Sequence, residues 1–203
     1  HGITTENVSV DVPVMIARKD KIVTTFTTGI ASLFKKNKVK SMHGKGTLLK
    51  RETSANTWQI KVDDSGNIET VQAKHVIIAT GSIPRSLSFA PIDNDRILDN
   101  AGALALTEVP KRLGVIGAGV IGLEMGSVWR RLGAEVTILE AMPGFLMAAD
   151  EQIAKEAKSL FAKESGLQIN TGINIKSIKI SKNNVIVNYS DSSNQEQILE
   201  VDK

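Results

Sequence analysis

The sequence contains no cysteine. A disulfide scaffold, a thiolate zinc site, a catalytic thiol and a dithiol redox pair are therefore excluded within its 203 residues. The three histidines, His1, His43 and His75, are too scattered to form a metal site, and we expect none. No apolar run approaches the roughly 18 residues of a membrane span, so we expect a cytoplasmic protein without a membrane segment.

Charge and composition narrow the protein class further. The 25 basic side chains exceed the 22 acidic ones by only three, which is too few to indicate a surface that binds nucleic acid. The hydrophobic fraction of 41% is that of a globular protein with one or two domains. The first residue is not Met, and the last ones, Leu199–Lys203, end without a turn, so we expect a fragment of a longer protein.

The first part of the chain predicts one long helix followed by short strands. Residues 11–38 carry apolar side chains at steps of three and four, and Asp11 is the expected N-cap. The strand-like runs that follow are Gly46–Lys50, Thr57–Val62 and Ile68–Ala79. The third run ends in the apolar stretch Val76–Ala79, which predicts a buried strand. The turn Asp63–Asn67 resembles part of a calcium loop but lacks its closing glutamate, so we expect a hairpin turn.

A connector at residues 83–110 leads to a second region in which strands and helices alternate. The expected strands are Leu113–Ile116, Glu135–Glu140, Leu167–Asn170, Ile173–Ile180, Val185–Tyr189 and Gln197–Val201, of which the last three are antiparallel. One helix follows the first strand and has Gly133 as its expected C-cap, and another begins at Asp150 and ends at Gly166. The residues expected to face inward are Ile121, Met125, Val128, Trp129 and Leu132 in the first helix, and Ile153, Ala157, Leu160 and Phe161 in the second.

The segment from Leu113 to Glu140 is the most informative. An apolar strand leads into Gly117, Gly119 and Gly122, and the next strand ends in an acid 18 residues after the third glycine, close to the roughly 20 of a dinucleotide fold. The glycines permit a tight turn, a close approach to a pyrophosphate and close packing of helix on strand. The N–H groups and dipole of the helix N-terminus stabilise phosphate charge. This pattern predicts a dinucleotide site; a βαβ turn without a ligand is the alternative.

The acid that ends the second strand indicates which dinucleotide binds. Glu140 can accept hydrogen bonds from both hydroxyls of an adenosine ribose. Its charge would repel a 2′-phosphate, and Ala141–Pro143 provide no arginine to receive one. We therefore expect NAD rather than NADP.

Residues Val76–Pro84 form a second motif, whose glycine precedes Gly117 by 36 residues. Together with Gly117–Glu124, this motif resembles the paired motifs of the pyridine nucleotide–disulfide oxidoreductases. The long helix with Phe26–Phe34, and Ala148–Asp150 after the acid, resemble the dihydrolipoyl dehydrogenase branch of that family. The resemblance covers essentially the whole chain.

The resemblance implies an α/β fold with two parts. A partial FAD-binding domain with a three-stranded β-meander is expected at residues 1–110, and a Rossmann-like NAD-binding domain that lacks its last strand at residues 111–203. FAD and NAD are the implied cofactors. The residues that match positions near FAD are Gly46, Thr80, Gly81 and Ser82. Those that match the NAD site are Gly117, Ala118, Gly119, Val120, Ile121, Gly122, Glu124, Glu140 and Ile173, with Glu124 near the junction of flavin and nicotinamide and Ile173 against the adenine.

The resemblance also implies a function for a longer parent protein. Enzymes of this branch are homodimers that pass electrons from dihydrolipoamide, on the lipoyl domain of a 2-oxoacid dehydrogenase complex, through a disulfide and FAD to NAD. The redox cysteines and the catalytic histidine of the family have no match in the chain, so we expect no catalytic residue within it and no activity from it alone. Two alternatives stay open: a non-catalytic dinucleotide-binding module, and a parent that is another flavin disulfide reductase.

Overall fold

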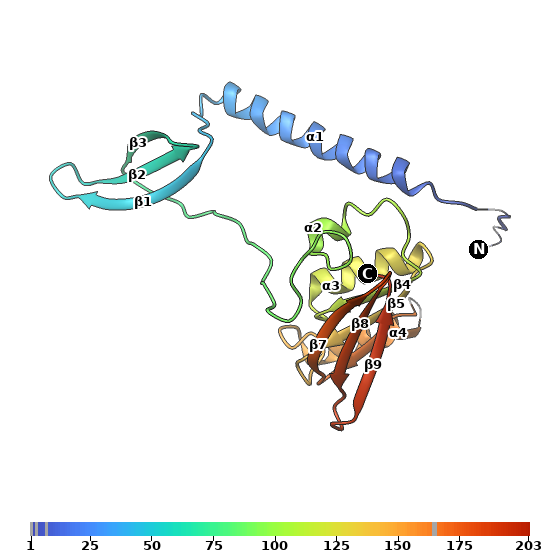
Figure 1. The fold of residues 1–203 in the computed structure, drawn as a ribbon. Helices are drawn as coiled ribbons and strands as arrows, with labels where there is room; N and C mark the ends of the chain where they lie inside the picture. The colour runs from blue at the N-terminus through green and yellow to red at the C-terminus, as the bar shows by residue number, and fades with distance from the viewer. Residues whose placement is uncertain (1, 3, 7, 164–165) are drawn as a thin grey trace. The chain divides into compact units, whose positions relative to one another are not determined.

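The computed structural model describes residues 2, 4–6, 8–163 and 166–203, which form two compact units (Figure 1). The larger unit combines residues 1–19 with residues 84–203, and the smaller unit is Asp20–Ile83. Within the described residues, the smaller unit has one sheet of three strands, and the larger unit has two. No helix in this part of the chain is long and apolar enough to cross a membrane.

The smaller unit contains most of helix α1 (Val12–Lys36) and an antiparallel meander (Figure 1). Its strands, in their order along the sheet, are β1 (Lys45–Glu52), β2 (Thr57–Asp64) and β3 (Asn67–Ala73). In the turn between β2 and β3, the carboxylate of Asp63 accepts a 3.0 Å hydrogen bond from the N–H of Gly66. The φ of Gly66 is +96°, which glycine adopts without strain. The meander and the hairpin turn are confirmed.

Helix α1 begins where the sequence predicts. Oδ1 of Asp11 accepts a 3.0 Å hydrogen bond from the N–H of Val14, a donor that has no partner within the helix. Only the first turns of α1 join a core in the described residues, through Val12, Met15 and Ile16. Farther along, the apolar side chains are exposed: Phe26 to 68% and Leu33 to 57%.

The predicted buried strand at Val76–Ala79 is wrong. Strand β3 ends at Ala73, and residues 74–83 form neither helix nor strand. The side chain of Ile77 is exposed to 91%. A strand needs a neighbour that takes up its backbone N–H and C=O groups, and none of the described strands pairs with this segment. Its apolar sequence alone is therefore not sufficient to make it a strand.

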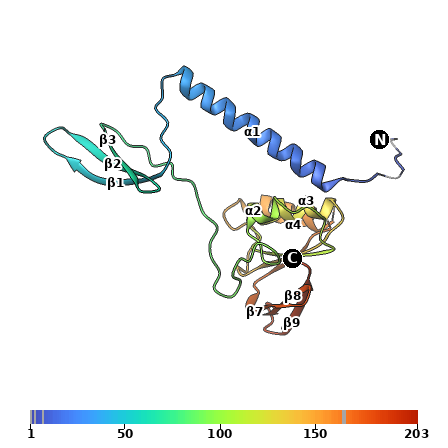
Figure 2. The same ribbon diagram turned by 45° about the horizontal axis from the view of Figure 1, so that its top comes forward.

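The larger unit has three layers: helices, a parallel sheet and an antiparallel sheet (Figure 2). In the parallel sheet, β5 (Glu135–Glu140) lies between β4 (Arg112–Ile116) and β6 (Gln168–Thr171). Helix α3 (Val120–Arg131) connects β4 to β5, and helix α4 (Glu151–Lys163) connects β5 to β6. The antiparallel strands are β7 (Asn174–Ser181), β8 (Asn184–Ser190) and β9 (Glu196–Val201). All six predicted strands of this region are confirmed.

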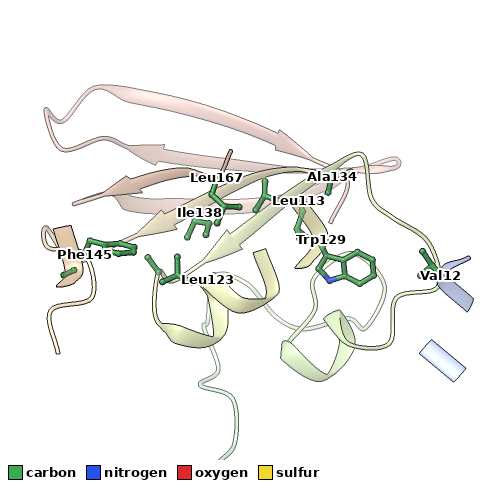
Figure 3. Packing of buried hydrophobic residues seen from close by; sticks show 11 residues of the cluster. Val12, Leu113, Leu123, Trp129, Ala134, Ile138, Phe145 and Leu167 are labelled. Atoms are coloured by element: carbon green, nitrogen blue, oxygen red, sulfur yellow. The ribbon is translucent and has the colours of Figure 1, made fainter. Parts of the chain in front are cut away.

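Alternating side chains along β5 hold the layers together. Ile138 packs on the helical side and Leu139 on the opposite side, because successive residues of a strand point to opposite faces. On the helical side, Trp129 of α3 belongs to the same buried cluster as Leu167 (Figure 3). On the other side, Leu139 clusters with Ile173, Val185, Val187 and Val201. Strand β5 is therefore fixed by packing on both faces, and with it the position of Glu140 at its end.

Helix α3 faces the sheet differently from the prediction. Trp129 is buried as expected, but Ile121 and Val128 are 54% and 41% exposed. The other buried residues are Leu123, Gly126 and Ser127. A Cβ at Gly126 would lie only 3.3 Å from Cδ1 of Ile138, so the helix lies close to the sheet there. Small residues at the contact therefore decide which face is buried, and a pattern of apolar residues does not reveal them. The φ of Gly133 is +112°, as expected of a C-cap glycine.

Helix α4 also begins at its predicted cap. Oδ1 of Asp150 accepts a 3.0 Å hydrogen bond from the N–H of Gln152. Of the residues predicted to face inward, Ala157 and Phe161 pack against the core. Ile153 and Leu160 are exposed instead, and Ala154 takes the buried position. The predicted end of the helix adjoins residues 164–165, which lie outside the described residues.

The last residues of the chain lie along the edge of β4 that is opposite to β5. The N–H of Asp202 donates to the C=O of Arg112 at 2.9 Å, and the N–H of Gly114 donates to the C=O of Lys203 at 3.0 Å. The carboxylate of Asp202 also pairs with the guanidinium of Arg112 at 2.9 Å. Partial burial raises the pKa of Asp202, but the hydrogen bonds from Arg112 outweigh it and hold this pKa below its ordinary value. Strand β4 is thus held at both edges.

Candidate functional site

The carboxyl ends of β4, β5 and β6 meet at one edge of the parallel sheet, where residues 117–122 form the glycine loop. The N–H of Gly117 donates to the C=O of Leu139 at 2.8 Å, and its φ is +99°. A Cβ at Gly122 would lie 2.1 Å from the carbonyl oxygen of Gly117. The fold itself therefore requires glycine at both positions, for a left-handed turn and for close packing.

Gly119, the glycine between them, is not required by the packing. Its φ is −73°, and a Cβ there would meet no atom within 4 Å. Gly119 is the N-cap residue of α3, and in the described part of the chain no side chain caps this helix. The first N–H groups of a helix lack partners within it and carry the positive end of its dipole. An uncapped helix start with open space beside it can accept a phosphate.

Glu140 turns its carboxylate toward the glycine loop. Oε2 accepts a hydrogen bond from the N–H of Ala118 at 2.7 Å, and Oε1 accepts one from the N–H of Met142 at 2.8 Å. Ala118 is only 2% exposed, so this contact lies at the base of the loop. Glu140 follows the last glycine of the loop, Gly122, by 18 residues. A hydrogen bond nevertheless joins the acid directly to the loop.

The glycine loop opens into a cavity of about 520 Å³ in the larger unit. The loop and the start of α3 form one wall, and residues of the connector form another. The charged residues of the lining are Arg85, Arg96, Asp99 and Lys203. Gly117, Gly119 and Gly122 of the loop all border this space. Val120 and Ile121, the two residues between the second and third glycines, are 67% and 54% exposed.

The connector wall was not predicted from the sequence. It includes a short helix, α2 (Asn100–Ala103), whose start is capped by Asp99. Oδ1 of Asp99 accepts a 2.8 Å hydrogen bond from the N–H of Gly102. An aspartate three residues before such a donor is a recognisable cap, and it could have marked the helical turn. That this turn borders the cavity depends on packing between distant parts of the chain.

Ile173 also lies beside Glu140. Its N–H donates to the C=O of Glu140 at 3.1 Å, at the end of β6. The side chain of Ile173 is only 4% exposed and packs in the cluster around Leu139. A second cavity, of about 440 Å³, adjoins this corner and includes Asn170, Thr171, Tyr189 and Asp191 in its lining. A ligand at this corner would contact the backbone of Ile173 more readily than its side chain.

The other predicted site residues are Glu124, in the larger unit, and four residues of the smaller unit. Glu124 is on α3, just beyond the glycine loop, and its side chain is exposed. Gly46, Thr80, Gly81 and Ser82 belong to the smaller unit and are exposed. A Cβ at Gly46 or Gly81 would meet no atom within 4 Å, so the backbone is open at both places. The structure therefore brings together the glycine loop, Glu140 and Ile173.

Known proteins are similar to this chain in sequence. The family model of the pyridine nucleotide-disulphide oxidoreductases matches residues 3–203. A dihydrolipoyl dehydrogenase of Cupriavidus necator is 53% identical over 203 residues, which are 100% of this chain and 41% of the relative. Dihydrolipoyl dehydrogenase 1, mitochondrial, of Arabidopsis thaliana is 42% identical over 203 residues, again 100% of this chain and 39% of the relative. The chain thus spans about two fifths of the length of these curated relatives.

Solved structures have the same fold. LpdA from Mycobacterium tuberculosis superposes with a TM-score of 0.82 at 24% identity, over 96% of this chain and 42% of that one. The flavoprotein disulfide reductase RclA from Escherichia coli gives a TM-score of 0.74 at 24% identity, over 95% of this chain and 41% of that one. These likenesses confirm the predicted Rossmann-like class. Since the family model matches nearly every residue, the chain belongs to the pyridine nucleotide-disulphide oxidoreductase family.

Proposed function

We propose that the glycine loop binds the diphosphate of NAD and that Glu140 binds the adenosine ribose. The contact that supports this most directly is the 2.7 Å hydrogen bond between the N–H of Ala118 and Glu140. It holds a carboxylate beside the uncapped start of α3, so that one nucleotide could reach both. The open space at Gly119 leaves room for phosphate oxygens near the helix N–H groups.

The remaining site residues are assigned to NAD or to FAD. The backbone of Ile173 would face the adenine, since its N–H bonds to the C=O of Glu140. Glu124 would place its charge toward the nicotinamide end, because it follows the glycine loop on α3. Gly46 and Thr80–Ser82 would hold FAD through open backbone segments of residues 1–110, and residues 111–203 would form the NAD-binding portion. FAD and NAD, when bound, supply the hydride-transfer chemistry.

We further propose that the complete protein is a dihydrolipoyl dehydrogenase. Relatives of that name are 53% and 42% identical to the chain over its whole length. Such an enzyme would pass electrons from dihydrolipoamide, on the lipoyl domain of a 2-oxoacid dehydrogenase complex, through a disulfide and FAD to NAD. The chain has no cysteine, so the disulfide would lie outside residues 1–203. Homodimer formation and a cytoplasmic location are part of the same proposal; the bacterial relative supports the location.

An exchange of charge at residue 140 tests the nucleotide assignment. Glu140→Arg removes the acceptor for the ribose hydroxyls and supplies a partner for a 2′-phosphate. We expect the ratio of NADP affinity to NAD affinity, measured by calorimetry, to rise at least tenfold. Glu135→Arg is the matched control, because Glu135 is exposed at the opposite end of the same strand. We expect this variant to have the same ratio of NADP affinity to NAD affinity as the original protein. An unchanged ratio in Glu140→Arg would remove Glu140 from the ribose site.

The absence of cysteine supports a second candidate for the chain on its own: a dinucleotide-binding module without catalysis. NADH formation from dihydrolipoamide by the isolated chain would exclude this candidate. A clear preference of the complete protein for NADPH would instead favour another flavin disulfide reductase. Calorimetry with NADH and NADPH on the complete protein measures this preference.

A further inference from the structure

We propose that Glu140 is also a positioning residue, which holds the glycine loop in its binding shape before a nucleotide arrives. This role is additional to the ribose contact and rests in part on the proposed function, because the loop is taken to be the diphosphate site. The contacts that suggest it lie within the chain itself. One carboxylate joins the N–H of Ala118, at 2.7 Å, to the N–H of Met142, at 2.8 Å.

The carboxylate joins two segments directly and is linked to a third through the backbone of Met142. The N–H of Ala118 belongs to the glycine loop, and the N–H of Met142 to the turn after β5. The C=O of Met142 accepts a hydrogen bond from the N–H of Gly172 at 2.9 Å, which ties that turn to the end of β6. Since β5 is packed on both faces, the carboxylate has a rigid base. A series of hydrogen bonds therefore links the loop to the rest of the sheet edge, through Ala118, Glu140, Met142 and Gly172.

Both roles fit on one carboxylate. An ionised carboxylate offers about four lone-pair sites on its two oxygens. Two of these sites are used by the N–H groups of Ala118 and Met142, one on each oxygen. Two sites remain, one on each oxygen, which is the number that the two hydroxyls of a ribose require. Glu140 need not release the loop in order to bind the sugar, so the loop shape and the ribose contact reinforce one another.

A glutamine at this position would keep the size of the side chain and lose the double acceptor. An amide has one oxygen, and its NH2 group is a donor. In Glu140→Gln, one of the two backbone N–H groups would face another donor. Glu140→Asp keeps the charge but is shorter by one methylene, so it should not reach both N–H groups. Glu135→Gln on the same strand is the matched control, since Glu135 is exposed and takes no part in this chain of contacts.

Amide hydrogen exchange in the ligand-free protein tests this role. We expect the N–H of Ala118 to exchange at least tenfold faster in Glu140→Gln and in Glu140→Asp, and at the original rate in Glu135→Gln. The N–H groups of Ile138 and Leu139 report whether β5 stays folded, and we expect them to be unchanged. An unchanged rate at Ala118 in both Glu140 variants would overturn the proposal. If Glu140→Gln does not fold, the aspartate variant decides the outcome.

A second measurement separates the loop from the ribose. An NAD analogue that lacks both hydroxyls of the adenosine ribose cannot use the ribose contact. If Glu140 also holds the loop, Glu140→Gln should weaken the binding of this analogue several-fold, although it removes a negative charge near the diphosphate. Equal or tighter binding of the analogue would overturn the positioning role. If the unsubstituted protein binds neither NAD nor the analogue, the proposed function fails, whereas the exchange rate of Ala118 still decides whether Glu140 holds the loop.

Discussion

Alanine at Gly122 should damage the fold, because this glycine lies where helix and strand touch. A Cβ there would be 2.1 Å from the carbonyl oxygen of Gly117 and 3.2 Å from Cγ1 of Val115. Real Cβ atoms are hardly ever closer than 3.0 Å to another atom. To bring the new Cβ to 3.0 Å from this oxygen, the start of α3 and the end of β4 must move apart by about 0.9 Å. Since the nearest atom is backbone, it cannot rotate away. We expect Gly122→Ala to lower the free energy of unfolding by about 1–3 kcal/mol.

Alanine at Gly119 is the matched case, in which the fold has room. The φ of −73° is open to any residue, and no atom lies within 4 Å of the added Cβ. We therefore expect the stability of Gly119→Ala to change by less than about 1 kcal/mol, because the freedom that the unfolded chain loses (about 0.4–1 kcal/mol) is opposed by the preference of an N-cap position for glycine over alanine. The methyl group would, however, occupy the space that we assign to the diphosphate. We expect NAD to bind at least tenfold more weakly, which corresponds to about 1.4 kcal/mol.

Urea denaturation and calorimetry with NAD measure the two effects on the same samples. We expect opposite profiles: loss of stability at Gly122, and loss of affinity with little change of stability at Gly119. If Gly122→Ala unfolds at the same urea concentration as the original protein, the helix and the strand do not touch closely at this glycine. If Gly119→Ala binds NAD with unchanged affinity, the backbone there does not approach the ligand.

Three further outcomes follow from the packing and the charges. Trp129 is 2% exposed, so Trp129→Ala should lower the free energy of unfolding by about 3–5 kcal/mol in urea denaturation. Arg112 holds the pKa of Asp202 below its ordinary value of 3.8. The lowered pKa contributes stability that is present above pH 3.8 and is lost as the pH falls through the lower pKa of the folded state. The unfolding midpoints of Asp202→Asn and the original protein should accordingly differ at pH 7 and converge in acid. Gly29→Ala, inside α1 with no atom within 4 Å of the new Cβ, should stabilise the helix by about 0.5–1 kcal/mol in thermal unfolding.

Features that depend on neighbouring residues could be predicted from the sequence. Strand β5 has the predicted bounds, Glu135–Glu140, and helix α4 begins at the predicted cap, Asp150. The caps are visible because an aspartate bonds to an N–H two or three residues ahead. The link between the glycine loop and Glu140 could also be anticipated. In a parallel βαβ unit, the ends of adjacent strands meet at one edge of the sheet.

Features that depend on distant partners could not be predicted. Val76–Ala79 has the composition of a strand, but no described strand pairs with it. The buried face of α3 is set by Gly126 and Ser127, which no apolar pattern would select. The hydrogen bond from the N–H of Met142 to Glu140 depends on the path of the turn after β5. The missed connector wall around α2 has the same cause, since α2 and the glycine loop line one cavity although they are separate segments of the sequence.

A crystal structure of the complete protein with NAD would show whether one nucleotide contacts both the uncapped start of α3 and the carboxylate of Glu140. We expect diphosphate oxygens within hydrogen-bonding distance of the N–H groups of Val120–Gly122. We also expect both adenosine ribose hydroxyls on Glu140, with the bond from Ala118 retained. NAD bound at any other place, or a ribose that does not touch Glu140, would rule out this binding mode.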